Sequence, residues 1–112
     1  MIVRHFTDVT AEQIADGFRK RVVIGQNEGA PNFIMRVFDV EPGFSSPFHE
    51  HFWEHEIFVV SGEGYIRNGQ EEDLPLGAGD TIFVPPYEKH CMVNKGSDIF
   101  RFVCLIPVGA EN

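Results

Sequence analysis

The sequence predicts an all-β domain with at most one short helix near the N-terminus. Three observations lead to this prediction. About nine short segments of high strand propensity follow one another, separated by turns rich in Gly, Pro and Asn. The 11 Phe, 11 Gly and 7 Pro among 112 residues suit strands joined by tight turns. Helical periodicity is almost absent. The short, regular spacing favours a sandwich or barrel over alternating strands and helices.

The length allows one domain, which we expect to span residues 1–112. A chain of this size buries roughly two-thirds of the surface that its unfolded form exposes, so one core can form without disulfides or other staples. The residues are 43% hydrophobic and 23% charged. These values are typical of globular proteins and speak against disorder.

The best helix candidate covers residues 10–16. Thr10 and Gln13 have the spacing of a capping box, in which two side chains cap the first backbone N–H groups. Gly17 would end this helix after about two turns.

The strand candidates end at recognisable turn residues. Among these turns, Asn68-Gly69 predicts a β-hairpin. The candidates cover residues 21–24, 33–40, 47–51, 55–60, 64–67, 70–74, 80–84, 90–93 and 99–106. Residues 57–60 and 102–106 are apolar on both faces of their strands. One face can line the interior, so the other needs a second sheet or another subunit, and we expect a homodimer.

The net charge of −8 excludes several classes of partner. A nucleic-acid-binding protein needs a basic face, and the nearest thing to a basic cluster is Arg19-Lys20-Arg21. No apolar run approaches the length of a membrane span, and residues 1–5 do not begin a secretory signal. We therefore expect no nucleic-acid partner, no membrane partner and a cytoplasmic location. Cys91 and Cys104 lack a CxxC spacing and are interpreted as buried thiols.

Four of the five histidines form a candidate metal site. His49, His51 and His55 lie within seven residues, and His90 follows a Pro-Pro turn. On an extended strand His49 and His51 share a face, and His55 can turn back towards them. Neutral imidazole binds Zn, Fe, Ni, Cu and Mn to differing degrees. His5 lies far from this group and is interpreted as a structural or surface residue.

The segment around the first three histidines resembles the first motif of the cupin superfamily. It runs from Gly43 through five residues to His49, skips one residue to His51, and continues to Gly62.

A second segment resembles the second cupin motif. It runs from Gly79 through five residues to Pro85, and then to His90 and Asn94. Tyr87 stands where the family usually has Gly. Both motifs have the family's internal spacing and order.

The resemblance implies a double-stranded β-helix, the jelly-roll barrel of cupins, with its metal-binding motifs within residues 43–94. It also implies one divalent metal ion per chain in the barrel mouth. Mn or Fe is favoured, and Zn or Ni also fits such a site.

The third metal ligand has two candidates, because many cupins use Glu at this position. Three residues separate His55 from His51 and six separate it from Gly62, whereas the corresponding gaps around Glu56 are four and five. The family tolerates three or four residues in the first gap and usually has six in the second. The resemblance therefore favours the ligand set His49, His51, His55 and His90, with Glu56 as the alternative third ligand.

Further polar side chains are candidates for a direct role. Glu56 is a candidate general base, although strand alternation points it away from His55. Tyr87 is a candidate hydrogen-bond donor to a substrate. Arg36 and Arg101 could pair with a substrate carboxylate, but we expect surface or intersubunit ion pairs for both.

Four neutral ligands leave the full charge on a divalent metal, and octahedral geometry leaves two neighbouring positions open. The full charge and the two open positions suit an anionic ligand that binds the metal through two oxygen atoms. The resemblance then implies a metal-dependent enzyme, of the dioxygenase, decarboxylase or isomerase type, acting on a small oxygen-rich metabolite. The alternative is a non-catalytic module that binds a small molecule.

Overall fold

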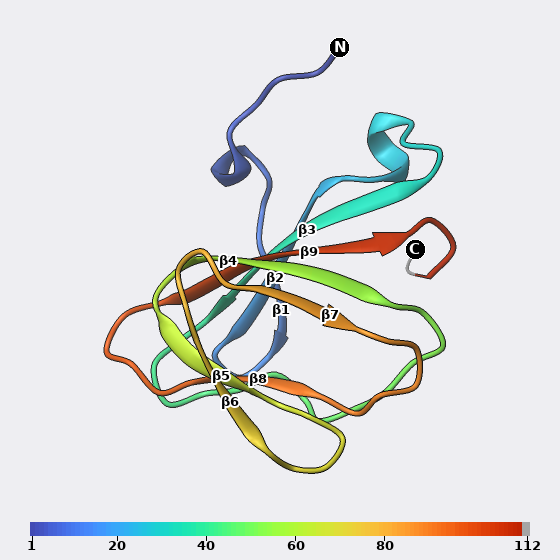
Figure 1. Ribbon diagram of the computed structural model, residues 1–112. Coiled ribbons are helices and arrows are strands. Elements are labelled where there is room, and N and C mark those ends of the chain that lie inside the picture. The colour runs from blue at the N-terminus through green and yellow to red at the C-terminus, as the bar shows by residue number, and fades with distance from the viewer. Residues whose placement is uncertain (111–112) are drawn as a thin grey trace.

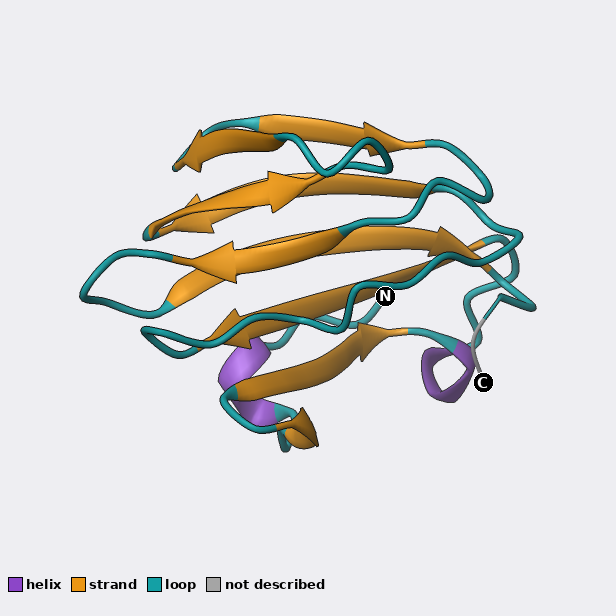
Figure 2. Ribbon diagram, turned by 90° about the horizontal axis from the view of Figure 1, so that it is seen from below, coloured by secondary structure: helices purple, strands orange, loops and turns teal. Residues whose placement is uncertain are grey.

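Two antiparallel β-sheets make up the computed structural model, which describes residues 1–110 (Figures 1 and 2). The larger sheet has the strand order β1-β2-β3-β9-β4-β7, and the smaller has the order β6-β5-β8. The predicted all-β jelly-roll class is confirmed. The strands are β1 (Glu12–Ala15), β2 (Phe18–Ile24), β3 (Phe33–Val40), β4 (His55–Ser61), β5 (Glu63–Arg67), β6 (Asp73–Gly77), β7 (Thr81–Val84), β8 (Cys91–Asn94) and β9 (Phe100–Pro107).

The predicted helix at residues 10–16 is wrong. Most of this segment forms β1, which pairs with β2 so that Glu12 lies opposite Lys20. A two-turn helix is unstable by itself, and here pairing with a neighbouring strand satisfies the backbone instead. Gly17, with φ +66°, makes the turn that joins the two strands. Within residues 1–110 the only helical elements are two short 3₁₀ turns, Phe6–Asp8 and Gln26–Glu28.

Two other local predictions differ from the structure. The hairpin turn at Asn68 is longer than the predicted two residues, because the Asn68 side chain accepts backbone N–H bonds from Gln70 and Glu72. The partner strand β6 therefore starts only at Asp73. Residues 47–51 form no regular strand, and an isolated bridge joins His49 to His90 instead.

The core lies between the two sheets and follows strand alternation. In β4, for instance, Ile57 and Val59 are buried whereas Phe58 and Val60 are exposed. The stacked rings of Phe18, Phe38 and Phe102 join the inner faces of three strands. The remaining buried apolar residues of the cluster are Ile34, Val40, Ile66, Val84, Met92, Phe100, Cys104 and Ile106.

The glycine that ends the first motif has a conformational role. Gly62 has φ +86°, and a Cβ atom at this position would lie 2.4 Å from the carbonyl oxygen of Ile99. Only glycine can make this turn between β4 and β5 without displacing the neighbouring chain.

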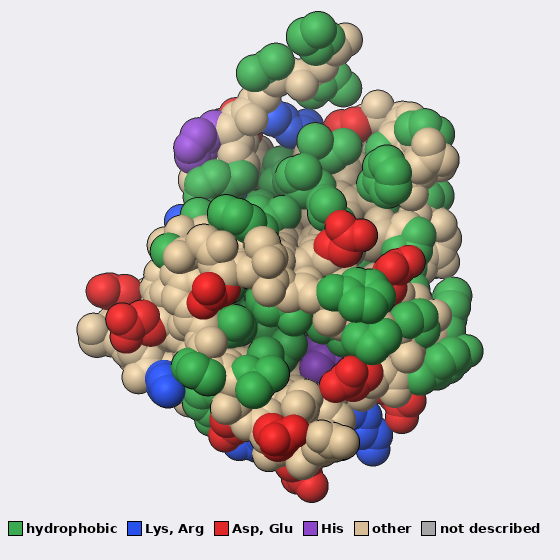
Figure 3. Space-filling model, in the orientation of Figure 1, with side chains coloured by type: hydrophobic (Ala, Val, Ile, Leu, Met, Phe, Trp, Pro, Cys, Tyr) green, Lys and Arg blue, Asp and Glu red, His purple; other side chains and the backbone are tan. Residues whose placement is uncertain are grey.

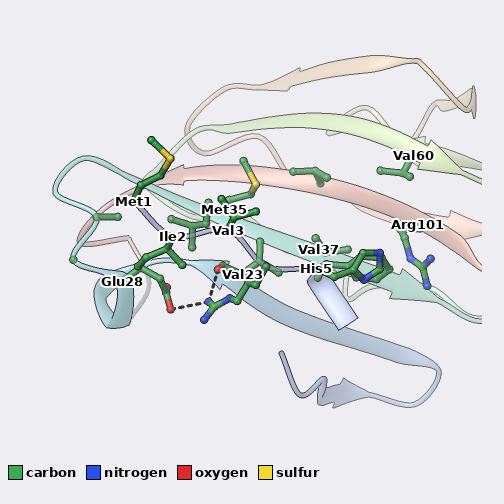
Figure 4. A pocket seen from close by; sticks show the side chains of 16 residues that line it. Met1, Ile2, Val3, His5, Val23, Glu28, Met35, Val37, Val60 and Arg101 are labelled. Carbon is green, nitrogen blue, oxygen red and sulfur yellow. Dashed lines mark hydrogen bonds and ion pairs between the residues drawn. The ribbon is translucent and has the colours of Figure 1, made fainter. Parts of the chain in front are cut away.

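The N-terminal segment passes over the outer face of the larger sheet, and its first three residues are largely exposed (Figure 4). Arg4 holds it there by donating hydrogen bonds to the Val23 carbonyl and to Glu28, both at 2.7 Å. A hollow of about 700 Å³ remains between this segment and the sheet. No helix among residues 1–110 is long and apolar enough to cross a membrane.

Candidate metal centre

Main-chain hydrogen bonds bring three separate histidine-bearing segments together. His49 and His90 exchange two backbone N–H···O bonds, of 3.2 and 3.0 Å, across their isolated bridge. The backbone N–H of Tyr87 donates to the carbonyl of His51 at 2.8 Å. His55 is the first residue of β4. The backbone thus sets the positions from which all four imidazole side chains project.

Three of the imidazoles are oriented in the same way by carbonyl groups two residues away. The Nδ1 atom lies 2.7 Å from Pro47 O in His49, 3.4 Å from Trp53 O in His51, and 2.8 Å from Glu88 O in His90. A carbonyl oxygen only accepts, so each Nδ1 carries the proton. The Nε2 lone pair of each ring is then left as the metal-binding atom.

These three rings form a compact cluster. His49, His51 and His90 each offer a ligand atom within 4.8 Å of the others. The Nε2 atoms of His51 and His55 lie 2.8 Å apart. The ring of His55 is also 5.0 Å from that of His90, measured between centroids. The fourth predicted histidine therefore borders the same cluster.

His55 differs from the others in what holds its Nδ1 atom. Cys104 Sγ lies 2.7 Å from this atom, and Arg36 Nη2 lies 3.2 Å from it. Because a guanidinium only donates, Nδ1 of His55 accepts and its Nε2 atom carries the proton that is shared with His51. For His55 to bind a metal through Nε2, the proton must move to Nδ1, from which the N–H can donate a hydrogen bond to the Cys104 sulfur.

The distances fit a metal ion with nitrogen ligands. Metal–nitrogen bonds of about 2.1 Å place neighbouring ligands about 3 Å apart and opposite ones about 4.2 Å apart. The 2.8 Å between His51 and His55 matches the first distance. The ligand atoms of His49, His51 and His90 lie within 4.8 Å of one another, which is slightly more than the distance between opposite ligands. Small side-chain shifts would therefore bring all three within bonding distance of one ion.

Burial favours the neutral form of His51, His55 and His90. It lowers the pKa of His51 to about 4, and it lowers the pKa of His55 to about 2, with a further contribution from the charge of Arg36. Burial also lowers the pKa of His90. Neutral imidazoles bind metals without first losing a proton to solvent, so the cluster is ready to bind at neutral pH.

A cavity of about 400 Å³ opens above the histidines. The ring of Trp53 stacks on that of His51, with centroids 4.2 Å apart and planes 7° from parallel. The wall is mainly apolar, with two cationic side chains. Besides the four histidines, its residues are Ile14, Phe18, Lys20, Arg36, Phe38, Ser46, Pro47, Trp53, Ile57, Met92, Phe102, Cys104 and Ala110.

The structure does not bring the candidate catalytic residues into this cavity. Glu56 is exposed on the opposite face of β4 from His55, where it borders a separate hollow beside Phe58 and Phe83. Tyr87 is 67% exposed. Its φ of +67° shows that it adopts the left-handed conformation for which the family uses Gly. Neither side chain lines the cavity within the described chain.

Asn94 of the second motif, and Asp80, which directly follows the first glycine of that motif, have structural contacts. Asn94 is buried and donates hydrogen bonds of 2.8 Å to the carbonyls of Val40 and Asp98. It also accepts one from the Gly96 N–H. Asp80 accepts a hydrogen bond from the Gly77 N–H at 2.7 Å.

One cavity residue differs from the sequence-based expectation, and a second has a contact that the sequence did not indicate. Arg36 was expected in a surface or intersubunit ion pair, but it is buried beside His55. Strand alternation along β3 predicts the inward position of Arg36, because Ile34 and Phe38 lie two residues before and after it and point into the core. Cys104 is buried, as predicted, but its contact with His55 depends on the pairing between strands. Arg101 forms its ion pair with Asp39 of its own chain.

Comparisons with known proteins relate the chain to several others. The solved polyketide cyclase RemF from Streptomyces resistomycificus superposes with a TM-score of 0.92 at 33% identity, covering 100% of this chain and 82% of that one. A gentisate 1,2-dioxygenase from Haloferax is 30% identical over 97 residues, which are 81% of this chain and 27% of the relative.

An oxalate-binding protein from Thermotoga maritima is 35% identical over 66 residues, which are 58% of this chain and 54% of the relative. The chain thus spans about a quarter of the dioxygenase and about half of the oxalate-binding protein. The cupin domain family model matches residues 36–106 and includes all four clustered histidines. This match covers more than half of the sequence, and the chain belongs to the cupin family.

Proposed function

We propose that the chain binds one divalent metal ion through His49, His51, His55 and His90, and that it is a metal-dependent enzyme acting on a small oxygen-rich metabolite. The observation that carries this proposal is the common orientation of the first, second and fourth of these imidazoles. Each has Nδ1 on a main-chain carbonyl and therefore Nε2 available as a ligand. Such outer contacts fix the tautomer and the ring direction of metal-binding histidines.

Mn or Fe is the favoured metal, and Zn or Ni also suits imidazole ligands. When bound, the metal would act as a Lewis acid on an oxygen of the ligand. The protein surrounds it with low-polarity walls such as Phe38, Trp53 and Phe102. These walls exclude water and strengthen electrostatic attraction for an anion. The expected partner is therefore a small anionic oxygen chelator.

A non-catalytic binding module is the second candidate. It is supported by the absence of any Asp, Glu or Tyr among the described residues that line the cavity, because such groups commonly serve as general acids or bases. Oxygen uptake and product formation with a panel of keto, hydroxy and enediol acids distinguish the two. Turnover supports the enzyme, whereas tight binding without turnover supports the module.

Oxalate is expected to bind the Mn-loaded protein with one ligand per chain and micromolar to millimolar affinity. The two carboxylate oxygens suit two neighbouring metal positions, and the four ligands are neutral. Titration calorimetry on protein loaded with Mn and on chelator-treated protein measures the difference. Equal binding to both preparations would contradict the metal-centred proposal.

We also propose a homodimer. Large apolar side chains stand exposed on the outer face of the larger sheet, including Phe33, Phe58 and Phe83, which are 70%, 50% and 60% exposed. Exposed hydrophobic groups lie between scattered acidic residues over one side of the molecule (Figure 3). A second copy would cover such a surface. Light scattering is expected to give twice the chain mass of 12.7 kDa, and a monomer at micromolar concentration would contradict this.

A cytoplasmic location stays a prediction from the sequence.

A further inference from the structure

A buried arginine stands at the inner end of the cavity. Arg36 lies on the inward face of β3 between Ile34 and Phe38, and it is only 5% exposed. It is paired in register with Cys104 of β9 and lines the same cavity as the histidines. A guanidinium stays charged at every pH the protein meets, so Arg36 itself is a permanent cation at this end of the cavity.

The guanidinium lies one imidazole ring away from the proposed metal. Its Nη2 atom is 3.2 Å from Nδ1 of His55, the ring atom opposite the proposed metal-binding Nε2. The same atom lies 2.9 Å from Cys104 Sγ, and the guanidinium carbon lies 4.9 Å from the centre of the Phe38 ring. When a metal is bound and Nδ1 of His55 carries the proton, the contacts with Cys104 and Phe38 would hold the guanidinium beside the histidine cluster.

A second cation lies on the same wall. Lys20 of β2 is paired in register with Phe38 and lines the cavity together with Arg36. The surrounding wall is made of Phe18, Phe102, Ile57 and similar apolar groups. A cavity that is largely apolar with a few fixed polar groups recognises a ligand by its apolar body and by the charge it presents at one point.

We infer that Arg36, assisted by Lys20, is the recognition site for a carboxylate on the substrate. The ligand class is a small carboxylic acid that binds the metal through a separate pair of oxygens and directs its carboxylate to the guanidinium. An arginine can bind a carboxylate through two parallel charge-assisted hydrogen bonds, and the low-polarity wall strengthens them. This inference rests on the proposed metal centre and adds to it the charge and shape of the substrate.

Two matched chelators test the inference on the Zn-loaded full chain. Butyrohydroxamate and the monohydroxamate of succinic acid bind a metal through the same oxygen pair, but only the second carries a carboxylate at its far end. Titration calorimetry is expected to show that wild-type protein prefers the carboxylate compound by about tenfold or more. In Arg36→Met this preference is expected to disappear, with both affinities expressed per zinc-loaded chain and the zinc content of each variant measured in parallel.

Arg19→Met is the matched control, because Arg19 is paired with Glu41 outside the cavity and its removal changes the net charge equally. It is expected to keep the full preference. If Arg36→Met does not fold, Arg36→Gln carries the same comparison, since it removes the charge and keeps polar atoms. A preference that survives in the folded Arg36 variant would overturn the inference, as would equal binding of both compounds by wild-type protein. If neither compound binds Zn-loaded wild-type protein, the proposed metal centre with open positions is wrong, and the inference about Arg36 is wrong with it.

Discussion

Asp39→Asn is expected to lower the free energy of unfolding by about 3–5 kcal/mol. Asp39 is 3% exposed, and it accepts two hydrogen bonds from Arg101, at 2.6 and 2.9 Å. Arg21 lies 3.3 Å from the same carboxylate. Burial raises the pKa of Asp39, but the two arginines outweigh burial and hold it below its usual value. The amide would leave two partly buried cations without their counter-charge.

This ion-pair network joins three strands and the N-terminal segment. Asp39 lies on β3, Arg21 on β2 and Arg101 on β9, and the Phe6 ring lies against both guanidinium groups. Urea unfolding at one fixed protein concentration measures the effect. Asp16→Asn removes the same charge from an exposed turn and is expected to change stability by less than about 0.5 kcal/mol. A loss below about 1 kcal/mol for Asp39→Asn would show that the network contributes little.

The stability of chelator-treated protein is expected to fall steeply as the pH drops from about 6.5 towards 4. Burial lowers the pKa of His51 to about 4 and that of His55 to about 2, whereas both are near 6.5 in an unfolded chain. In this range the unfolded state binds more protons than the folded state, so the stabilisation present above pH 6.5 is lost on acidification. Each histidine contributes up to about 1.4 kcal/mol per pH unit, and we expect a total of about 1–3 kcal/mol per unit.

Urea unfolding at several pH values measures this slope. In His55→Gln the slope is expected to decrease, because the most strongly shifted histidine is absent. His5→Gln is the control, since His5 is exposed and lies outside the cluster. Unchanged stability between pH 6.5 and 4 would contradict the burial of neutral imidazoles in this cavity.

Most of the fold could be predicted from local sequence signals. The range 33–40 coincides with β3 because Pro31 and Pro42-Gly43 limit the strand on both sides. Residues 10–16 show the limit of such signals. Thr10 and Gln13 have the spacing of a helix capping box, but residues Glu12–Ala15 pair with β2 and form a strand. This pairing depends on β2 being held in the sheet by β3, which is more distant in the sequence.

The candidate site could be predicted in part, for a similar reason. The spacing of the cupin motifs indicated which histidines to consider, and the backbone bridges between them follow from that framework. The contact of His55 with Cys104 joins residues 49 positions apart, so it depends on the register between β4 and β9. Strand alternation predicts that Arg36 points inward. A surface position was nevertheless expected, because arginine side chains are rarely fully buried.

Metal content of the His55→Ala and Glu56→Ala variants tests the central claim most directly. His55 Nε2 lies beside the histidine cluster, whereas Glu56 is exposed on the opposite face of the same strand. Elemental analysis after loading and dialysis is expected to give one divalent metal per chain in wild-type protein and in Glu56→Ala, and little or none in His55→Ala. Retention of the metal by His55→Ala together with its loss from Glu56→Ala would contradict the four-histidine centre.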